Sequence, residues 1–362
     1  MNLDAYDYLL PEKNLALSPS VPRDSSKLFV YDTKSDEIIF DHFYNLSKYI
    51  PSNSFMVLNN TKVLPARVTM KKESGGKVVL LFLVNELTGS RVIRSLTDRK
   101  INVGEKIYFD KENYLKIIAQ KENIFDLRLN FSREHLFELL NKYGTMPIPP
   151  YLKKSPLKRD ELLQKYQTIF AKTDGSSAAP TASLHFTDNV FNKLDKKGIK
   201  KLFVTLHVGL GTFAPITDDN IKQKKLHEEY YEIDGETLQS IDRLKQEGKK
   251  LVAVGTTVVR TLETEVRYRN FLSQRGPLHP ESEKNLVPSP LKQTNLFIFP
   301  HYDFKMVDVM VTNFHLPKSS LMMLVEAFLQ YKGTKRRLVE LYNIAIKEDF
   351  RFYSFGDVMM IL

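Results

Sequence analysis

The chain has 362 residues, 42% of them hydrophobic and 27% charged, so it is long enough for two domains with substantial cores. It contains no cysteine, which excludes disulfides, thiolate metal sites and a cysteine nucleophile. Its formal net charge of +10 favours an anionic partner such as nucleic acid, with a merely lysine-rich composition as the alternative.

The beginning of the chain, MNLDAYDYLLPEKN, carries acids and a proline and lacks a basic segment followed by an apolar run. We therefore expect no signal peptide. No apolar run approaches the ~20 residues that a membrane-spanning helix needs. The sequence predicts a soluble, cytoplasmic protein with no membrane partner.

Short strands dominate the first third of the chain. Between 27 and 60, apolar runs are broken by Ser, Asp, Asn and Pro, which indicates strands and turns. From 66 to 131 several short strands follow at close spacing without a helical period, and this pattern predicts a small antiparallel β-barrel. A helix should follow, with Ser132 as its N-cap and Gly144 just after its end.

After the proline-rich segment PIPPYLKK the pattern changes to alternating helices and strands. Capped helices are expected at 187–198, 234–248 and 256–271, and strands at 201–208 and 250–255. Such alternation predicts βαβ units and a mostly parallel sheet. We therefore predict an α/β fold whose larger α/β domain, residues 1–64 and 146–362, carries the antiparallel β-barrel as an insertion at 65–145.

Three segments that are far apart in the chain place a histidine beside small or hydroxyl residues at the edge of an apolar run. They are 175–186, 206–216 and 312–320, and they contain His185, His207 and His315. This composition is typical of strand ends that line a pocket, where parallel α/β sheets bind ligands. We predict one composite site there. No short-spaced pair links the histidines, so a metal site is the weaker alternative.

Two glycine-containing turns follow predicted strands. In GTTVVR, Thr256 and Thr257 begin a helix and can donate hydrogen bonds to a polar ligand, with Arg260 one turn further on. A plain threonine N-cap with Arg260 on a solvated face is the alternative. The GLG at 209–211 lacks the rest of a dinucleotide-binding motif, but it allows a ligand to approach the backbone closely.

The stretch 149–172, PPYLKKSPLKRDELLQKYQTIFAK, interleaves lysine and arginine with tyrosine and phenylalanine. That pattern suits contacts with RNA phosphates and stacking on bases. The alternative is a solvated helix that packs through Leu162, Leu163 and Tyr166.

Segments along nearly the whole chain resemble the S-adenosylmethionine:tRNA ribosyltransferase-isomerase family of queuosine synthesis. They include YDYLLPEKNLA, VLNNTKVLPAR, MPIPPYL, GSSAAPTASLHFT, TLHVGLGTFAPI, AVGTTVVRTLE, VTNFHLPKSSLMMLVEAF and RFYSFGDVMMIL. The resemblance implies a larger α/β domain with an inserted β-barrel. It also implies transfer of the ribosyl part of S-adenosylmethionine to 7-aminomethyl-7-deazaguanine at the tRNA wobble position. Epoxyqueuosine forms, and adenine and methionine leave.

The resemblance also implies partners and residue roles. S-adenosylmethionine is a consumed substrate, no metal or other cofactor is implied, the partner is the tRNA anticodon arm, and we expect a monomer. A sulfonium acidifies the adjacent C5′ hydrogens, so a base is needed; His185, His207 and His315 are the candidates. Glu229 with His227 can protonate the leaving adenine or hold the ribose hydroxyls. The substrate-binding candidates are Asn60, Arg67, Gln167, Ser177, Thr181, Gly209, Gly211, Thr212, His227, Thr256, Thr257, Arg260, Asn313 and Lys318.

The chain departs from the family pattern in the barrel, where RVIRSLTD lacks the usual tryptophan and proline, and at three single positions elsewhere. Lys224 stands where a histidine is usual, and Ser183 and His301 stand where glycine is usual. The extra side chains can narrow a pocket, and the lost histidine removes a proton carrier. A diverged paralogue that binds tRNA with little or no transferase activity is therefore the alternative function, followed by a transferase with a changed nucleoside substrate.

Overall fold

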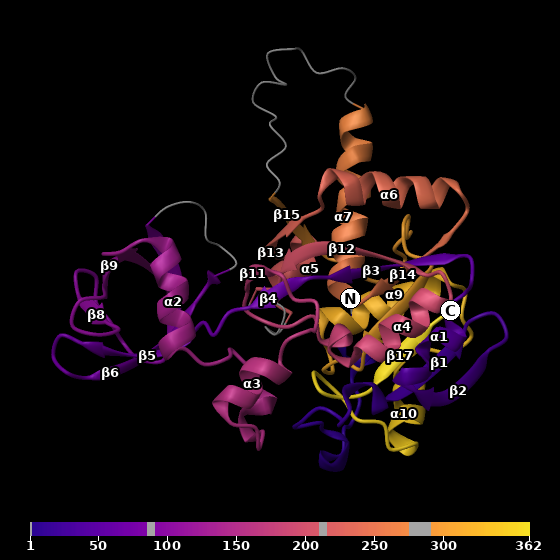
Figure 1. The fold of residues 1–362 in the computed structure, drawn as a ribbon, viewed down its shortest axis with the longest axis horizontal. Helices are drawn as coiled ribbons and strands as arrows, with labels where there is room; N and C mark the ends of the chain where they lie inside the picture. Colours follow the sequence, from indigo (N-terminus) through magenta and orange to yellow (C-terminus); the bar gives the residue numbers. More distant parts are fainter. Residues whose placement is uncertain (1, 85–90, 210–215, 275–290) are drawn as a thin grey trace.

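The computed structural model describes residues 2–84, 91–209, 216–274 and 291–362 of the chain (Figure 1). Its larger part is built on a nine-stranded sheet with the order β15-β13-β12-β3-β14-β16-β17-β1-β2. In that order the strands are Lys292–Leu296, Lys225–Glu232, Lys200–His207, Ser54–Asn59, Lys250–Val254, Val309–Asn313, Val358–Ile361, Lys27–Asp32 and Glu37–His42.

The sheet is mixed: its centre is parallel, and antiparallel pairings lie on either side of this centre. Strands β12, β3, β14 and β16 are parallel neighbours, and β17 is parallel to β1. The pairs β16–β17, β1–β2, β12–β13 and β13–β15 are antiparallel. The predicted α/β fold is confirmed, but "mostly parallel" overstates a sheet in which half of these pairings are antiparallel. The connection from β1 to β2 is too short for the crossover that a parallel pair requires.

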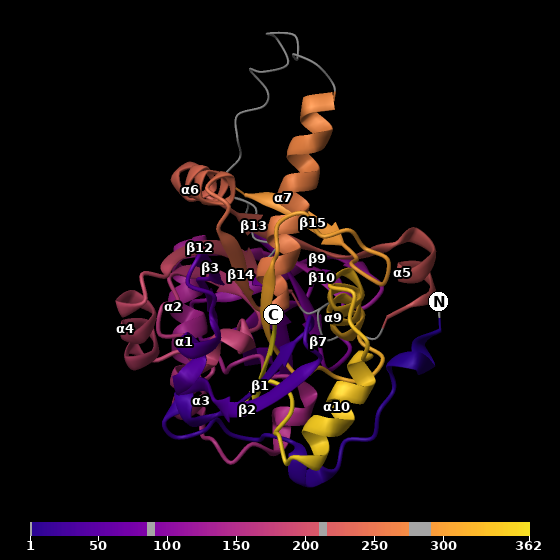
Figure 2. The same ribbon diagram turned by 90° about the vertical axis from the view of Figure 1, so that its right-hand side faces the viewer.

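The central strands are buried on both faces because their side chains alternate. Leu28 and Val30 of β1 pack into one hydrophobic cluster, whereas Phe29 and Tyr31 pack into another on the opposite face. Helices α1 and α4 cover the first face and α6, α7, α9 and α10 the second (Figure 2). The helices are α1 Leu46–Tyr49, α4 Asp188–Lys196, α5 Asp218–Gln223, α6 Gly235–Gln246, α7 Thr256–Gln274, α9 Ser320–Tyr331 and α10 Leu338–Lys347.

The smaller part is a closed six-stranded barrel, which confirms the prediction of an inserted antiparallel β-barrel. Its order is β10-β7-β6-β5-β8-β9, and every described pairing is antiparallel. It has its own core, which includes Leu80, Phe82 and Leu127. From β5 to β10 the strands are Arg67–Lys72, Lys77–Phe82, Val92–Thr97, Lys106–Tyr108, Tyr114–Lys121 and Ile124–Leu129.

The chain enters and leaves the barrel between two neighbouring strands of the larger part. Strand β4 (Thr61–Val63) precedes the barrel and pairs in parallel with β11 (Thr173–Ser176), which follows it. Helix η6 (Pro150–Lys154) and helix α3 (Arg159–Lys165) lie on the return path. The limits 64/65 and 145/146 of the two domains stay predictions.

Helix α2 (Arg133–Tyr143) packs against the barrel core and begins as predicted. The hydroxyl of Ser132 accepts a hydrogen bond from the N–H of His135 at 3.2 Å. The helix ends at Gly144, but with φ of −79° rather than in the left-handed conformation. A Cβ at Gly144 would lie 1.8 Å from the carbonyl oxygen of Pro65, so close backbone approach explains this glycine.

Short 3-10 helices complete the described structure. They are η1 Leu3–Tyr6, η2 Glu12–Asn14, η3 Arg23–Ser25, η4 Phe43–Asn45 and η7 Thr181–His185. Within the described ranges, no helix combines the length and the apolar character needed to cross a membrane.

Replacing His301 with glycine is expected to stabilise the protein. His301 is exposed and has φ of 70°, a left-handed conformation that costs a residue with a Cβ about 1–2 kcal/mol. After the greater flexibility of glycine in the unfolded chain is subtracted, H301G should raise the free energy of unfolding in urea by about 0.5–1 kcal/mol. His42→Gly, at φ of −117°, is the control and should lower it. Equal effects of the two changes would contradict the conformational explanation.

Candidate functional site

One cavity lies at the carboxyl ends of the central parallel strands. The segments that follow β12, β14 and β16 contribute to its wall, as do η7 and the loop before β17. The structure therefore brings together parts of the three histidine segments. The lining residues are Tyr151, Ala179, Pro180, Thr181, Ala182, Val208, Gly255, Thr256, Thr257, Thr312, Asn313, Phe314, His315, Leu316, Ser319, Leu321, Tyr353 and Ser354.

The turn from β14 into α7 presents two threonines to the cavity. Gly255 has φ of 91°, and its N–H donates to the carbonyl of Val311 at 2.7 Å, which ties this turn to β16. Helix α7 begins at Thr256, so the backbone N–H groups of its first turn face the same end of the sheet. Thr257 accepts a hydrogen bond at its hydroxyl from the Asn59 amide at 3.3 Å. This corner suits a polar or anionic ligand group.

His315 lines the cavity as a neutral ring. Its Nε2 lies 2.9 Å from the hydroxyl of Thr312, and its backbone N–H donates to the hydroxyl of Tyr342 at 3.0 Å. Tyr8 donates from its hydroxyl to the backbone carbonyl of His315. Burial lowers the pKa of His315 to about 3, because a charged imidazolium cannot be solvated there. At neutral pH the ring can therefore donate one hydrogen bond and accept another.

A second polar wall joins η7 to β16. The hydroxyl of Thr181 donates to Oδ1 of Asn313 at 2.8 Å, and Nδ2 of Asn313 donates to the carbonyl of Tyr353 at 3.2 Å. The Tyr353 ring packs against that of Tyr151, with centroids 4.8 Å apart. Tyr353 has φ of 72°, an uncommon conformation for a bulky residue that is often found at binding sites.

His207 ends β12 and lies next to the cavity wall rather than in it. Its Nδ1 is 2.8 Å from the hydroxyl of Thr61. A Cβ on Gly175 would lie 2.9–3.1 Å from three atoms of the His207 ring, so only glycine leaves the ring its present place. Burial lowers the pKa of His207 to about 4, and the Asp174 carboxylate opposes this shift.

Glu229 and Arg260 form a buried ion pair beside the end of β12. Their side chains are 3% and 5% exposed, and Nη1 of Arg260 donates to Oε2 of Glu229. The other carboxylate oxygen, Oε1, accepts the N–H of Gly209 at 2.8 Å. Among the described residues, Nε and Nη2 of Arg260 are buried without a hydrogen-bond partner. The alternative of a solvated Arg260 is therefore wrong, because α7 buries this face.

His185 does not line the cavity, and its ring contacts two backbone carbonyls. Its Nδ1 is 3.1 Å from the carbonyl of Ala182 and its Nε2 is 2.7 Å from that of Gly356. Burial lowers its pKa, although both carbonyls act in the opposite direction. The ring therefore connects η7 to the loop before β17, and both of these segments line the cavity.

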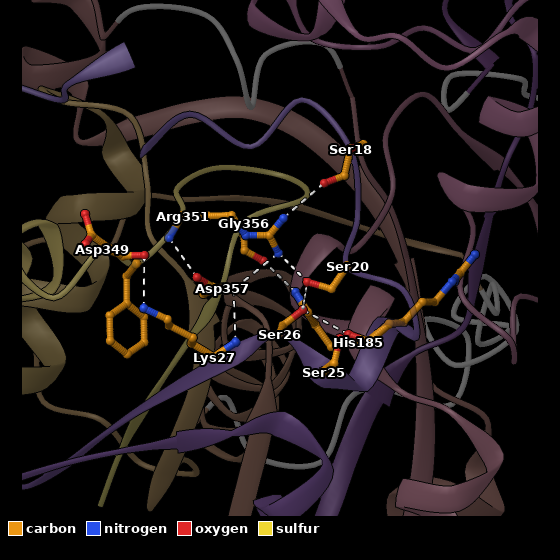
Figure 3. A network of polar contacts seen from close by, with 12 residues as sticks. Ser18, Ser20, Ser25, Ser26, Lys27, His185, Asp349, Arg351, Gly356 and Asp357 are labelled. Atoms are coloured by element: carbon orange, nitrogen blue, oxygen red, sulfur yellow. Dashed lines mark hydrogen bonds and ion pairs between the residues drawn. The ribbon is translucent and has the colours of Figure 1, made fainter. Parts of the chain in front are cut away.

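That loop is fixed by a network around Asp357 (Figure 3). The carboxylate, 1% exposed, accepts the N–H groups of Lys27 at 3.0 Å and Arg351 at 2.7 Å. Arg351 also donates from its guanidinium to Asp357 at 3.3 Å and to the hydroxyl of Ser20. Because the loop contains Tyr353, this network positions part of the cavity wall.

The other predicted residues that the structure describes do not line the cavity. Asn60 accepts from the Thr205 hydroxyl at 2.7 Å, and Gln167 exchanges two hydrogen bonds with the backbone of Val63. Ser177 is buried with no partner for its hydroxyl in the described part of the chain. Arg67 is half-buried at the start of β5, His227 is exposed on β13, and Lys318 forms ion pairs with Asp4 and Asp7. Gly211 and Thr212 lie outside the described residues.

Sequence reasoning missed several residues of the cavity wall. Tyr151, Thr312, Ser319, Tyr353 and Ser354 all line it. The segments MPIPPYL and RFYSFGDVMMIL marked two of these regions, but nothing in them placed Tyr151 against Tyr353. Asn59 was missed as well: it is fully buried and links the end of β3 to Leu206 and Thr257.

The three single-residue departures from the family pattern do not line the described cavity, although Ser183 directly follows the lining residue Ala182. Ser183 is buried in η7, with no partner for its hydroxyl among the described residues. Lys224 caps α5 in a left-handed conformation and is exposed, as is His301. None of them belongs to the lining. Within the described ranges, no cluster of three or more His, Asp and Glu side chains could hold a metal ion.

The chain is an α/β protein with a cavity beyond the carboxyl ends of parallel strands, which is where proteins of this class bind ligands. Residues 3–361 match the family described as "Queuosine biosynthesis protein". The chain belongs to this family.

Individual relatives cover the whole chain. The S-adenosylmethionine:tRNA ribosyltransferase-isomerases of Thermosipho melanesiensis and Staphylococcus haemolyticus are 41% and 39% identical, and each match covers 100% of both chains. The crystal structure of S-adenosylmethionine tRNA ribosyltransferase from Thermotoga maritima is 29% identical with a TM-score of 0.52. That match covers 99% of this chain and 100% of the other.

Proposed function

We propose that this protein is an S-adenosylmethionine:tRNA ribosyltransferase-isomerase. It transfers and isomerises the ribosyl group of S-adenosylmethionine onto 7-aminomethyl-7-deazaguanine at the tRNA wobble position, and it releases adenine and methionine. The observation that carries the proposal is the cavity, whose wall comes from segments that also carry the family resemblance. S-adenosylmethionine is consumed, and no resident cofactor is part of the proposal. We place the reaction in the cytoplasm and infer that a monomer performs it.

The cavity chemistry suits a sulfonium nucleoside. The rings of Tyr151, Phe314 and Tyr353 line it, and aromatic faces attract a cation within about 6 Å. Hydroxyl and amide groups of Thr181, Thr257 and Asn313 can meet the ribose and the base. These groups support binding of the substrate without a metal.

His315 is proposed as a hydrogen-bonding residue for the reacting ribose or adenine. With a pKa of about 3 it is neutral at pH 7 and is a weak base. Its place in the wall allows it to touch the substrate, whereas His185 acts through the loop it supports. Glu229 and Arg260 keep the end of β12 in position through Gly209.

Adenine release tests the proposal. Purified protein is mixed with S-adenosylmethionine and either tRNA that carries 7-aminomethyl-7-deazaguanine or matched tRNA that carries guanine. We expect release only with the modified tRNA. Release with neither tRNA, while the modified tRNA still binds, would favour the diverged paralogue.

His315→Gln should reduce adenine release about 10- to 100-fold, because the proposed role of the side chain is a hydrogen bond to the reacting group, worth about 1–3 kcal/mol. Far-ultraviolet circular dichroism and tRNA affinity serve as controls and should be unchanged. Unchanged turnover in H315Q would show that His315 does not contact the reacting part of the substrate.

A further inference from the structure

The outer face of the barrel places like charges directly opposite one another. Lys106 of β8 pairs with Lys116 of β9, which in turn pairs with Arg128 of β10. The neighbouring residues in each strand point inward and are buried, so these three side chains point outward. Directly opposite like charges destabilise a sheet. Fold stability therefore does not explain this row.

A second row lies beside the first. Lys77 of β6 pairs with Lys71 of β5, Lys71 with Tyr108 of β8, and Tyr108 with Tyr114 of β9. The two tyrosine rings are in contact, with centroids 5.5 Å apart. The Lys106 ammonium lies 4.8 Å from the Tyr114 ring centre, which joins the two rows.

One carboxylate contacts this surface: Glu73 accepts a hydrogen bond from the hydroxyl of Tyr108 at 3.4 Å. Among the described residues, none of the five cations forms an ion pair. Residues 65–172 contain 21 Lys and Arg against 12 Asp and Glu, whereas the rest of the chain contains 32 against 31. Almost all of the net charge of +10 therefore lies in the barrel and the segment that follows it.

We propose that this surface, the barrel face, binds RNA. Its members are Lys71, Lys77, Lys106, Tyr108, Tyr114, Lys116 and Arg128. The cations neutralise backbone phosphates, and the partly exposed tyrosine rings stack on bases, a combination typical of RNA-binding sheet surfaces. The proposal rests on the proposed function in one respect: the RNA is the substrate tRNA.

The barrel face would hold a part of the tRNA remote from the wobble nucleotide. Strands β8 and β9 lie on the side of the barrel turned away from the larger sheet, along the longest axis of the molecule (Figure 1). Charge removal there leaves the cavity untouched. It should weaken tRNA binding without slowing turnover at saturating tRNA.

The test is the triple variant K106Q/K116Q/R128Q. In fluorescence anisotropy with labelled tRNA, its Kd should rise about 10- to 100-fold at low salt, and the slope of log K against log salt should fall by roughly 2–3. Tyr114→Leu should raise Kd about tenfold without changing that slope. For the triple variant, kcat for adenine release should stay at the wild-type value, and only KM for tRNA should rise.

The matched control is K196Q/K200Q/K250Q, which removes three exposed charges near the opposite, amino-terminal ends of the parallel strands. It should bind tRNA like the wild type. Thermal unfolding of the barrel variant should occur at or above the wild-type temperature, because like-charge repulsion is relieved.

Suppose that the wild type releases adenine and that the barrel variant binds tRNA with an unchanged Kd and salt slope. This result would overturn the inference and leave the proposed function standing. A wild type that binds tRNA but releases no adenine would overturn only the proposed function. Weaker binding of the variant to anionic phospholipid vesicles, with tRNA affinity unchanged, would identify a membrane surface instead and also overturn the inference.

Discussion

Lowering the pH from 6.5 to 5 is expected to destabilise the protein by about 3 kcal/mol through His207 and His315. Burial lowers their pKa values to about 4 and 3. Unfolding exposes both rings to water, where their pKa returns to about 6.5. Below pH 6.5 the unfolded chain therefore binds protons that the folded chain excludes, and each ring costs about 1.4 kcal/mol per pH unit.

The free energy of unfolding therefore decreases as the pH falls. Both histidines have folded-state pKa values below their unfolded values, so their stabilisation is fully present above pH 6.5. It is lost as the pH falls toward the folded values. Burial also lowers the pKa of His185, so this histidine likewise reduces the stability of the fold as the pH falls.

Urea denaturation at half-unit steps between pH 7.5 and 5 measures this dependence. Carboxylates such as Asp41, with a pKa lowered from 3.8, titrate below this window. Burial raises the pKa of Glu263, so this carboxyl opposes the loss of stability as the pH falls. His207→Gln should reduce the slope of the free energy of unfolding against pH below pH 6 by about 1.4 kcal/mol per pH unit, which corresponds to one proton. A free energy of unfolding that stays constant between pH 6.5 and 5 would show that these rings are not buried as neutral groups.

Glu229→Gln is expected to lower the free energy of unfolding by about 3–5 kcal/mol. Glutamine keeps the size of the side chain and can still accept the N–H of Gly209, but it removes the negative charge. Arg260 is then left as a buried cation, and its Nε and Nη2 are without partners among the described residues. The loss therefore measures the cost of an unpaired buried charge.

Two further variants make this prediction specific. Glu228→Gln changes the exposed neighbour on β13 and should alter stability by less than about 0.5 kcal/mol. The double variant E229Q/R260M should recover much of the loss, because removing both charges removes the desolvation cost. A double variant no more stable than E229Q would show that the charges are not coupled.

Much of the fold could be read from local patterns. Ser132 and Thr187 cap helices through hydrogen bonds to N–H groups three residues ahead, and such short-range chemistry is visible in the sequence. The spacing of short strands predicted the barrel, and the alternation of helices and strands predicted the α/β part. The antiparallel pairing of β16 with β17 was not visible, because the partners Met310 and Ile361 are separated by two helices and a loop, and no local pattern specifies the direction in which such strands pair.

The sequence likewise indicated some residues of the candidate site, whereas others depended on the tertiary structure. Residue types and turns by themselves placed Thr256 and His315 at strand ends that line a pocket, whereas Thr181 and Asn313 became candidates only through the family resemblance. Whether a histidine faces the cavity, as His315 does, or two backbone carbonyls, as His185 does, depends on which distant loop packs against it. The same holds for the barrel face, because cross-strand register alone places Lys116 between Lys106 and Arg128. Such contacts arise only when the chain is packed, and no local sequence pattern specifies them.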